Sequence, residues 1–191
     1  MPLVANSSVN ALYQHSKETE PALILVPQAP KASQIGAWAF DAVADSLIQL
    51  LDEVVSTYDV DKNRIYICGL SNGGAGTWHL LLKRPDFFAA AVPICGYLHK
   101  ESATDRVISR EMNILEAKSL KHLPIWLFHA EDDEVVTIHN SRQPVKVLQE
   151  VGNKQIHYTE YATGMIKPPH CCWDQAFATP ELLPWLFKQS K

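Results

Sequence analysis

The sequence has no long apolar run and no concentration of basic residues. No uninterrupted apolar segment approaches the roughly 20 residues that a membrane-spanning helix requires. The start, Met1-Pro2-Leu3-Val4, has no basic region followed by an apolar core of the kind found in signal peptides. The net charge is -4, so the chain offers no basic surface for polyanions. These absences predict a soluble protein that binds neither nucleic acid nor a membrane, and they leave its localisation open.

Cysteine is also scarce. The four cysteines, at positions 68, 95, 171 and 172, are too few and too unevenly placed for a disulfide framework. A bridge between the adjacent Cys171 and Cys172 would be strained. His170 stands beside this pair, but consecutive residues do not readily reach one tetrahedral centre, and the chain has no C-x-x-C motif. We therefore expect reduced thiols, no metal and no cofactor.

The length of the chain fits one domain. With 191 residues, of which 47% are hydrophobic, it is long enough for one core and too short for two typical enzyme domains. We expect a single domain over residues 1–191. Five short β-rich runs alternate mostly with helical patterns, which predicts an α/β fold with a mostly parallel sheet flanked by helices. The predicted strands are 22–26, 64–68, 89–95, 124–129 and 156–161.

The helices are predicted from apolar spacing and from stop signals. Apolar residues recur every three to four positions from Val43 to Tyr58, with Asp41 as the candidate N-cap. Another helix is predicted after Ser141, with Gly152 as its stop. Residues 97–122 are the least regular, with a loose helical pattern at 107–115. An ordinary surface crossover and a functional lid are both open interpretations of that segment.

The most informative motif is G-x-S-x-G at Gly69-Leu70-Ser71-Asn72-Gly73. It follows a β-rich run directly and precedes a predicted helix at 75–84 that Pro85 stops. This context is typical of a nucleophile elbow, a strained strand-to-helix turn that presents a serine hydroxyl. Glycine is expected on both sides of Ser71 because a Cβ would not fit there. The motif therefore predicts Ser71 as a catalytic nucleophile.

A serine nucleophile needs a histidine base and a carboxylate that orients it. His170 alone among the eight histidines lies on a loop after the last predicted strand, and we favour it as the base. The carboxylate is expected from residues 131–134, an acidic run at the carboxyl end of the strand 124–129, where such sites assemble. At least two of these four acidic residues are expected to be merely solvated. The remaining candidate bases, expected instead to be packed or on the surface, are His79, His129 and His139.

Two further parts of an active site are predicted less directly. The backbone N–H of Asn72, at the start of the helix after the elbow, is the expected first donor to an oxyanion. No segment of the sequence identifies the second donor. Three tryptophans, Trp38, Trp78 and Trp173, are candidate walls of the substrate pocket, and core packing is an equal alternative for each.

Taken together, these motifs resemble the esterase and "predicted peptidase" branch of the α/β-hydrolases, relatives of polyhydroxybutyrate depolymerases and feruloyl esterases. The likeness extends from about Pro21 to the C-terminus. Residues 129–137 match the family pattern H-G-x-x-D-x-V-V-P, which assigns the acid to Asp133. Because Ala130 and Thr137 depart from the pattern, Asp132 is the runner-up. The other segments that carry the resemblance are 27–30, 61–66, 69–78, 89–96, 123–129 and 169–173.

The resemblance implies hydrolysis of carboxylic esters through an acyl-enzyme, with a small-molecule or polysaccharide-linked ester as substrate. A serine peptidase with the same triad and a non-catalytic, incomplete module are the alternatives. Relatives begin with further strands, one of which ends in a His-Gly loop that provides the second oxyanion donor. No such pattern precedes Pro21. We therefore expect an N-terminally truncated domain that lacks these strands and self-associates through its open sheet; secreted relatives would fit such a truncation.

Overall fold

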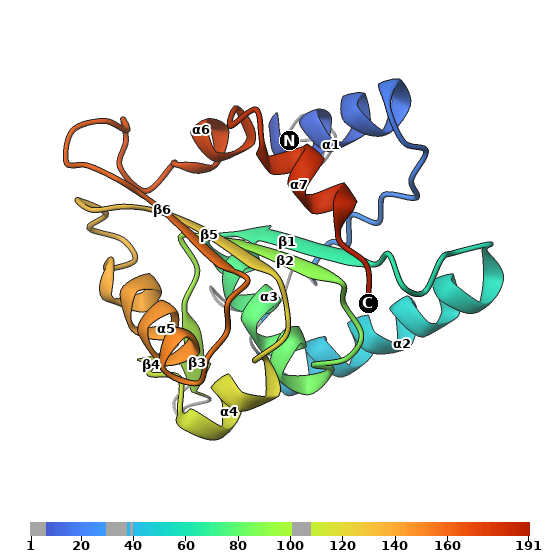
Figure 1. Ribbon diagram of the computed structural model, residues 1–191, viewed down its shortest axis with the longest axis horizontal. Helices are drawn as coiled ribbons and strands as arrows, with labels where there is room; N and C mark the ends of the chain where they lie inside the picture. The colour runs from blue at the N-terminus through green and yellow to red at the C-terminus, as the bar shows by residue number, and fades with distance from the viewer. Residues whose placement is uncertain (1–6, 30–37, 39, 101–107) are drawn as a thin grey trace.

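The structure, a computed structural model, describes residues 7–29, 38, 40–100 and 108–191 (Figure 1). At its centre is a four-stranded sheet with the order β1-β2-β5-β6, in which every neighbouring pair is parallel. The α/β class predicted from the sequence is confirmed. The four strands are β1 (Tyr66–Leu70), β2 (Ala90–Ile94), β5 (Ile125–Ala130) and β6 (Ile156–Tyr161).

Helices cover both faces of the sheet (Figure 1). One face packs against α2 (Asp41–Thr57), α3 (Asn72–Lys83), α4 (Ile114–Ser119) and α5 (His139–Glu150). The other packs against α1 (Ser7–Glu18), α6 (Trp173–Phe177) and α7 (Leu182–Lys188). No helix in the described part of the chain is long and apolar enough to cross a bilayer.

Alternate residues of each strand enter opposite layers. Ile125 and Leu127 of β5 belong to the core under α2 to α5, whereas Trp126 and Phe128 pack with the core under α6 and α7. This is the two-residue period of a β-strand. Because both faces are covered, both sets are apolar, and the strand is a nearly continuous apolar run in the sequence.

The predicted strand at 22–26 is wrong. Residues 21–29 form no strand, and Leu23 and Leu25 are 55% and 38% exposed. β-rich composition produces a strand only where a neighbouring strand completes the hydrogen bonds. In the described residues β1 pairs with β2 alone, so no ladder reaches this segment.

Residues 97–122 differ from the loose helix that the sequence suggested. A short antiparallel hairpin, β3 (Leu98–Lys100) with β4 (Ile108–Arg110), precedes α4. The helical pattern at 107–115 is therefore wrong over its first half. Asn113 begins α4 with a capping box, in which its side chain accepts from Glu116 N–H and the Glu116 carboxylate accepts from Asn113 N–H. The middle of the segment considered as a lid, 101–107, lies outside the described residues.

The remaining helices match their stop signals. α3 ends at Lys83, before Pro85, and α5 ends at Glu150, before Gly152, whose φ is +85°. The predicted N-cap of α2 is wrong by one residue, because Phe40 is the N-cap and Asp41 is the first helical residue. Its carboxylate therefore contacts α3, where Lys83 lies 2.9 Å away.

Candidate active site

The turn between β1 and α3 holds Ser71 in a strained conformation. Its φ is 52° and its ψ is −115°, in the region that side chains rarely adopt. A Cβ on Gly69 would lie 2.1 Å from Gly73 O, so glycine is required there. The expected steric need at Gly73 is wrong, because a Cβ on that residue would meet nothing within 4 Å. The close approach lies one residue later, where a Cβ on Gly74 would be 2.8 Å from the Cα of Gly96.

Three side chains predicted from the sequence form one hydrogen-bonded chain. His170 Nε2 lies 2.8 Å from Ser71 Oγ, and His170 Nδ1 lies 2.7 Å from Asp133 Oδ2. An ionised carboxylate only accepts hydrogen bonds, so Nδ1 carries the hydrogen and Nε2 is free to accept from the serine hydroxyl. Ser71 follows β1, Asp133 follows β5 and His170 lies on the loop after β6, so the parallel sheet brings all three to its carboxyl edge.

The Asp133 carboxylate is fully enclosed and accepts four hydrogen bonds. Its side chain is 0% exposed. Oδ1 accepts from the N–H groups of Val135 and Val136, at 2.8 and 3.0 Å, and Oδ2 accepts from both His170 and His129. Burial raises the pKa of this carboxyl, but the bonds from His129, His170, Val136 and Val135 outweigh burial and lower the pKa to about 2. Asp133 is therefore ionised at neutral pH.

The neighbouring acidic residues point elsewhere. Asp132 Oδ2 accepts from Gly164 N–H at 2.9 Å, on the loop after β6, and makes no hydrogen bond to His170. Glu131 accepts from Thr163 on the same loop. Of the two aspartates considered from the sequence, it is Asp133 that contacts His170.

Sulfur lies close to this chain. The Sγ of Cys95, an oxygen of Asp133 and a ring nitrogen of His170 lie within 4.8 Å of one another, the spacing of a metal-ligand set. The pKa of the Cys95 thiol is raised by its hydrogen bond with Cys172 and by burial, which opposes the thiolate that a metal needs. His170 Nδ1 and Asp133 Oδ2 are already hydrogen-bonded to each other. The cluster is better suited to a hydrogen-bond network than to a metal.

The three tryptophans have different surroundings. Trp78 is 1% exposed and packs in the core with Leu81 and Ile125, so the expectation that it lines a pocket is wrong. Its position on α3 turns it toward the sheet. Trp38 packs against the backbone of Gly76, where a Cβ would be 2.7 Å from the Cβ of Trp38. Trp173 is half-buried and stands edge-on to His170, with 5.8 Å between the ring centroids.

Asn72 brings two kinds of donor to the start of α3. Its backbone N–H has no hydrogen-bond partner among the described residues. Its side-chain oxygen accepts from the hydroxyl of Tyr97 at 2.8 Å, which leaves the amide nitrogen free to donate. Burial raises the pKa of Tyr97, so the phenol keeps its proton. Sequence reasoning missed Tyr97, which lies on the irregular segment after β2.

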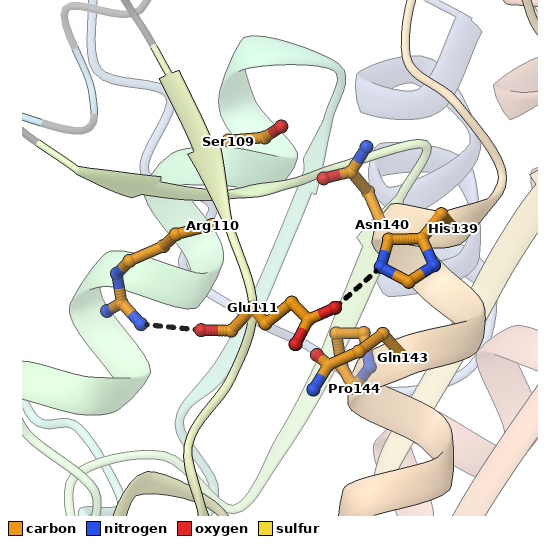
Figure 2. Close-up of a pocket in the computed structure, with 7 residues that line it drawn as sticks. All are labelled: Ser109, Arg110, Glu111, His139, Asn140, Gln143 and Pro144. Atoms are coloured by element: carbon orange, nitrogen blue, oxygen red, sulfur yellow. Dashed lines mark hydrogen bonds and ion pairs between the residues drawn. The ribbon is translucent and has the colours of Figure 1, made fainter.

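His139, another histidine considered from the sequence, lies away from this chain. It lines a hollow of about 300 Å³ between β4 and the first turns of α5, open to solvent. In Figure 2 its ring points toward Glu111, and the two are 3.1 Å apart. The lining residues of the hollow include none of the three in the hydrogen-bonded chain; they are Ser109, Arg110, Glu111, His139, Asn140, Gln143 and Pro144.

The chain is similar to known proteins in sequence and in structure. A profile of the prolyl oligopeptidase family matches residues 39–113. The solved structure of a thermostable esterase is 34% identical, and the match covers 93% of this chain and 46% of that chain, with a TM-score of 0.78. The chain has the α/β-hydrolase fold, and its sequence is similar to that of an esterase with this fold.

Two curated relatives of this α/β-hydrolase match shorter regions. Poly(3-hydroxyalkanoate) depolymerase C of Paucimonas lemoignei is 36% identical over 55 residues, which is 29% of this chain and 13% of the depolymerase. A bifunctional acetylxylan esterase/xylanase of Neocallimastix patriciarum is 22% identical over 130 residues, which is 66% of this chain and 17% of that enzyme. The chain described here thus spans less than half the length of each of these relatives.

Proposed function

We propose that this α/β-hydrolase cleaves carboxylic esters through an acyl-enzyme formed on Ser71. The observation that carries the proposal is the hydrogen-bonded chain from Ser71 Oγ through His170 to Asp133, with distances of 2.8 and 2.7 Å. These distances lie within the range over which a base can take a proton from a nucleophile. The strained backbone of Ser71 and the enclosed, ionised carboxylate of Asp133 support the same assignment.

The chemistry follows from the donors and acceptors. Ser71 Oγ attacks the ester carbonyl while His170 Nε2 takes the hydroxyl proton, and Asp133 stabilises the imidazolium that forms. The carbonyl oxygen becomes an oxyanion, to which the Asn72 N–H donates at the positive end of α3. His170 then returns the proton to the departing alcohol. A water molecule then attacks the carbonyl of the acyl-enzyme while His170 takes its proton. The carboxylic acid is released, and the proton returns to Ser71 Oγ.

The substrate class is a small-molecule or polysaccharide-linked ester. The names of the esterase, depolymerase and acetylxylan esterase relatives support it. Trp173, which stands beside His170, is our candidate for one wall of the pocket, and Trp38 for a second. The proposed mechanism needs no metal and no organic cofactor.

Two other functions have specific support. A serine peptidase would use the same three residues, and the match to the prolyl oligopeptidase family favours it. A non-catalytic module is favoured by the outer edge of β1, which pairs with no strand in the part of the chain that the structure describes. An ester needs less protonation of its leaving group than an amide does, so ester cleavage is the less demanding reaction for this site.

The test compares p-nitrophenyl esters with peptide p-nitroanilides, before and after treatment with a fluorophosphonate. We expect ester turnover that the reagent abolishes, and mass spectrometry should find a single adduct on the peptide containing Ser71. Ser71→Ala is the matched control and should neither turn over nor be labelled. Faster amide cleavage would favour the peptidase. A folded protein without turnover or labelling would favour the non-catalytic module.

A further inference from the structure

One oxygen of Asp133 is shared between two imidazole rings. His170 Nδ1 lies 2.7 Å from Asp133 Oδ2, and His129 Nε2 lies 3.1 Å from the same oxygen. The proposed hydrolysis uses only the first of these rings. The His129 side chain is 0% exposed, so it does not reach solvent.

The tautomer of His129 follows from its partners. Its Nε2 also lies 2.9 Å from the carbonyl oxygen of Val136, which can only accept. Nε2 therefore carries the hydrogen and shares it between Val136 O and Asp133 Oδ2. The opposite nitrogen, Nδ1, lies 2.7 Å from Ser141 Oγ and in the neutral ring accepts from that hydroxyl. Both ring nitrogens are thus engaged, and the ring is held at both ends.

The backbone explains why His129 is well placed to hold this carboxylate. His129 is the second-last residue of β5, and Asp133 lies four residues later, after the chain has turned back over the end of the strand. Ser141 comes from α5, so a strand and a helix together fix the ring. Backbone N–H groups bond to Oδ1 of Asp133. Besides His170, the group that bonds to Oδ2 is His129.

We propose that His129 is a positioning residue for the hydrolysis, which fixes Asp133 Oδ2 toward His170 and takes up part of the charge of the carboxylate. The inference rests on the proposed function of Ser71, His170 and Asp133. Without the His129 hydrogen bond, Oδ2 would have one donor fewer, so the carboxylate would be more basic and would stabilise the protonated form of His170 more strongly. The acid limb of the pH–rate profile would then move to higher pH.

Other ionisable groups also face this site. Cys95 comes from the end of β2, and Cys171 and Cys172 come from the segment after His170. Glu160 of β6 lies beside His129 in the strand register and is paired with Arg142. These groups are unchanged in a variant at position 129, so a difference between variants at this position reports on the His129 hydrogen bond.

The experiment compares His129→Leu, which removes the donor, with His129→Gln, whose amide nitrogen can replace Nε2. We expect His129→Leu to lower kcat about 10- to 100-fold, the effect of losing one hydrogen bond to a charged group, with KM changed by less than about twofold. Its acid limb of kcat/KM should move to higher pH, and His129→Gln should restore both values toward those of the parent. His139→Leu is the matched control, since this exposed histidine on α5 should leave both values unchanged.

A ¹⁵N imidazole NMR spectrum gives a readout that needs no hydrolysis. We expect His129 to show the Nε2–H tautomer in the unsubstituted protein, which tests the proposal even if His129→Leu fails to fold. An Nδ1–H tautomer for His129, or a folded Leu variant with the kcat and the acid limb of the parent, would overturn the proposal. Absent ester turnover with these NMR results would refute the esterase function alone.

Discussion

The surroundings of Asp133 and the outer edge of β1 differ in how far their polar groups are hydrogen-bonded within the described residues. At Asp133, two histidines and two backbone N–H groups converge on one carboxylate. At β1, Ile65 O accepts from Ala89 N–H, just before β2, and Ser71 N–H donates to Ile94 O in β2. The backbone groups of the odd-numbered residues therefore face β2, and those of Tyr66, Cys68 and Leu70 face outward. The backbone N–H and C=O groups of those three residues have no partner in the described part of the chain.

The difference matters because the two regions meet at Ser71. The base and the acid lie on loops after β6 and β5, which pair along their full length. The nucleophile follows β1, whose two faces are covered but which pairs only with β2 in the described part of the chain. We therefore infer that the acid–base half of the site is the more firmly supported half, because its two strands pair with each other. The strand before the nucleophile has one partner strand among the described residues.

The largest effect is expected from the enclosed corner. Asp133→Asn should lower kcat by up to about 10⁴-fold, because the amide favours the wrong tautomer of His170. Asp132→Asn is the matched control and should change kcat far less, because its carboxylate bonds to Gly164. Steady-state kinetics on an activated ester measures both. If Asp132→Asn were the more damaging change, the contact with His170 would not identify the orienting acid.

The glycines of the elbow provide the next test, on the side of β1. Gly69→Ala should lower the free energy of unfolding by about 3 kcal/mol or more, because the added Cβ meets Gly73 O at 2.1 Å. Gly73→Ala has open space and a helical backbone, and should raise the free energy of unfolding by up to about 1 kcal/mol. Urea unfolding separates the two. Equal destabilisation by both changes would contradict the geometry of this turn.

Acid should lower the free energy of unfolding by protonating Asp133. The pKa of Asp133 is lowered from 3.8 to about 2, so its ionised form stabilises the folded state above about pH 4. That contribution, about 2 kcal/mol, should be lost as the pH falls from about 4 to 2. Urea unfolding at pH 5 and pH 2 measures the loss, and Asp133→Asn should lack this part of it. An equal loss in that variant would place the acid sensitivity in other carboxylates.

The smallest effect is expected at the open edge. We expect self-association through β1, seen as concentration-dependent sedimentation. Cys68→Pro removes an outward-facing N–H without breaking the ladder to β2, and should raise the dissociation constant at least about tenfold. Ile67→Pro is the counterpart, because its N–H faces β2 and its loss should abolish cooperative unfolding. A protein that stays monomeric over the whole concentration range would show that the edge is already blocked.

Local pattern predicted most of the elements, together with Ser71 and His170, whereas Asp133 was selected from the acidic run 131–134 by the family resemblance. Strands at 89–95, 124–129 and 156–161 were found to within one residue, because both faces are covered and the apolar runs are continuous. Ser71 was identified from the G-x-S-x-G motif, which consists of five consecutive residues. The strand at 22–26 was predicted wrongly, since strand formation depends on a neighbour that local composition does not reveal.

The sequence by itself determined the core strands β2, β5 and β6 and the helices α2, α3 and α5, because apolar period, turn residues and helix stops act within a few residues of one another. It also determined the chemistry available at the strand ends, including an elbow serine, an acidic run and a histidine loop. Only the tertiary structure decided that Trp78 is core, that Tyr97 holds Asn72, and that His129 shares the carboxylate of Asp133. Those outcomes depend on which side chains meet across elements, and contacts between distant residues arise only when the sheet and its helices pack.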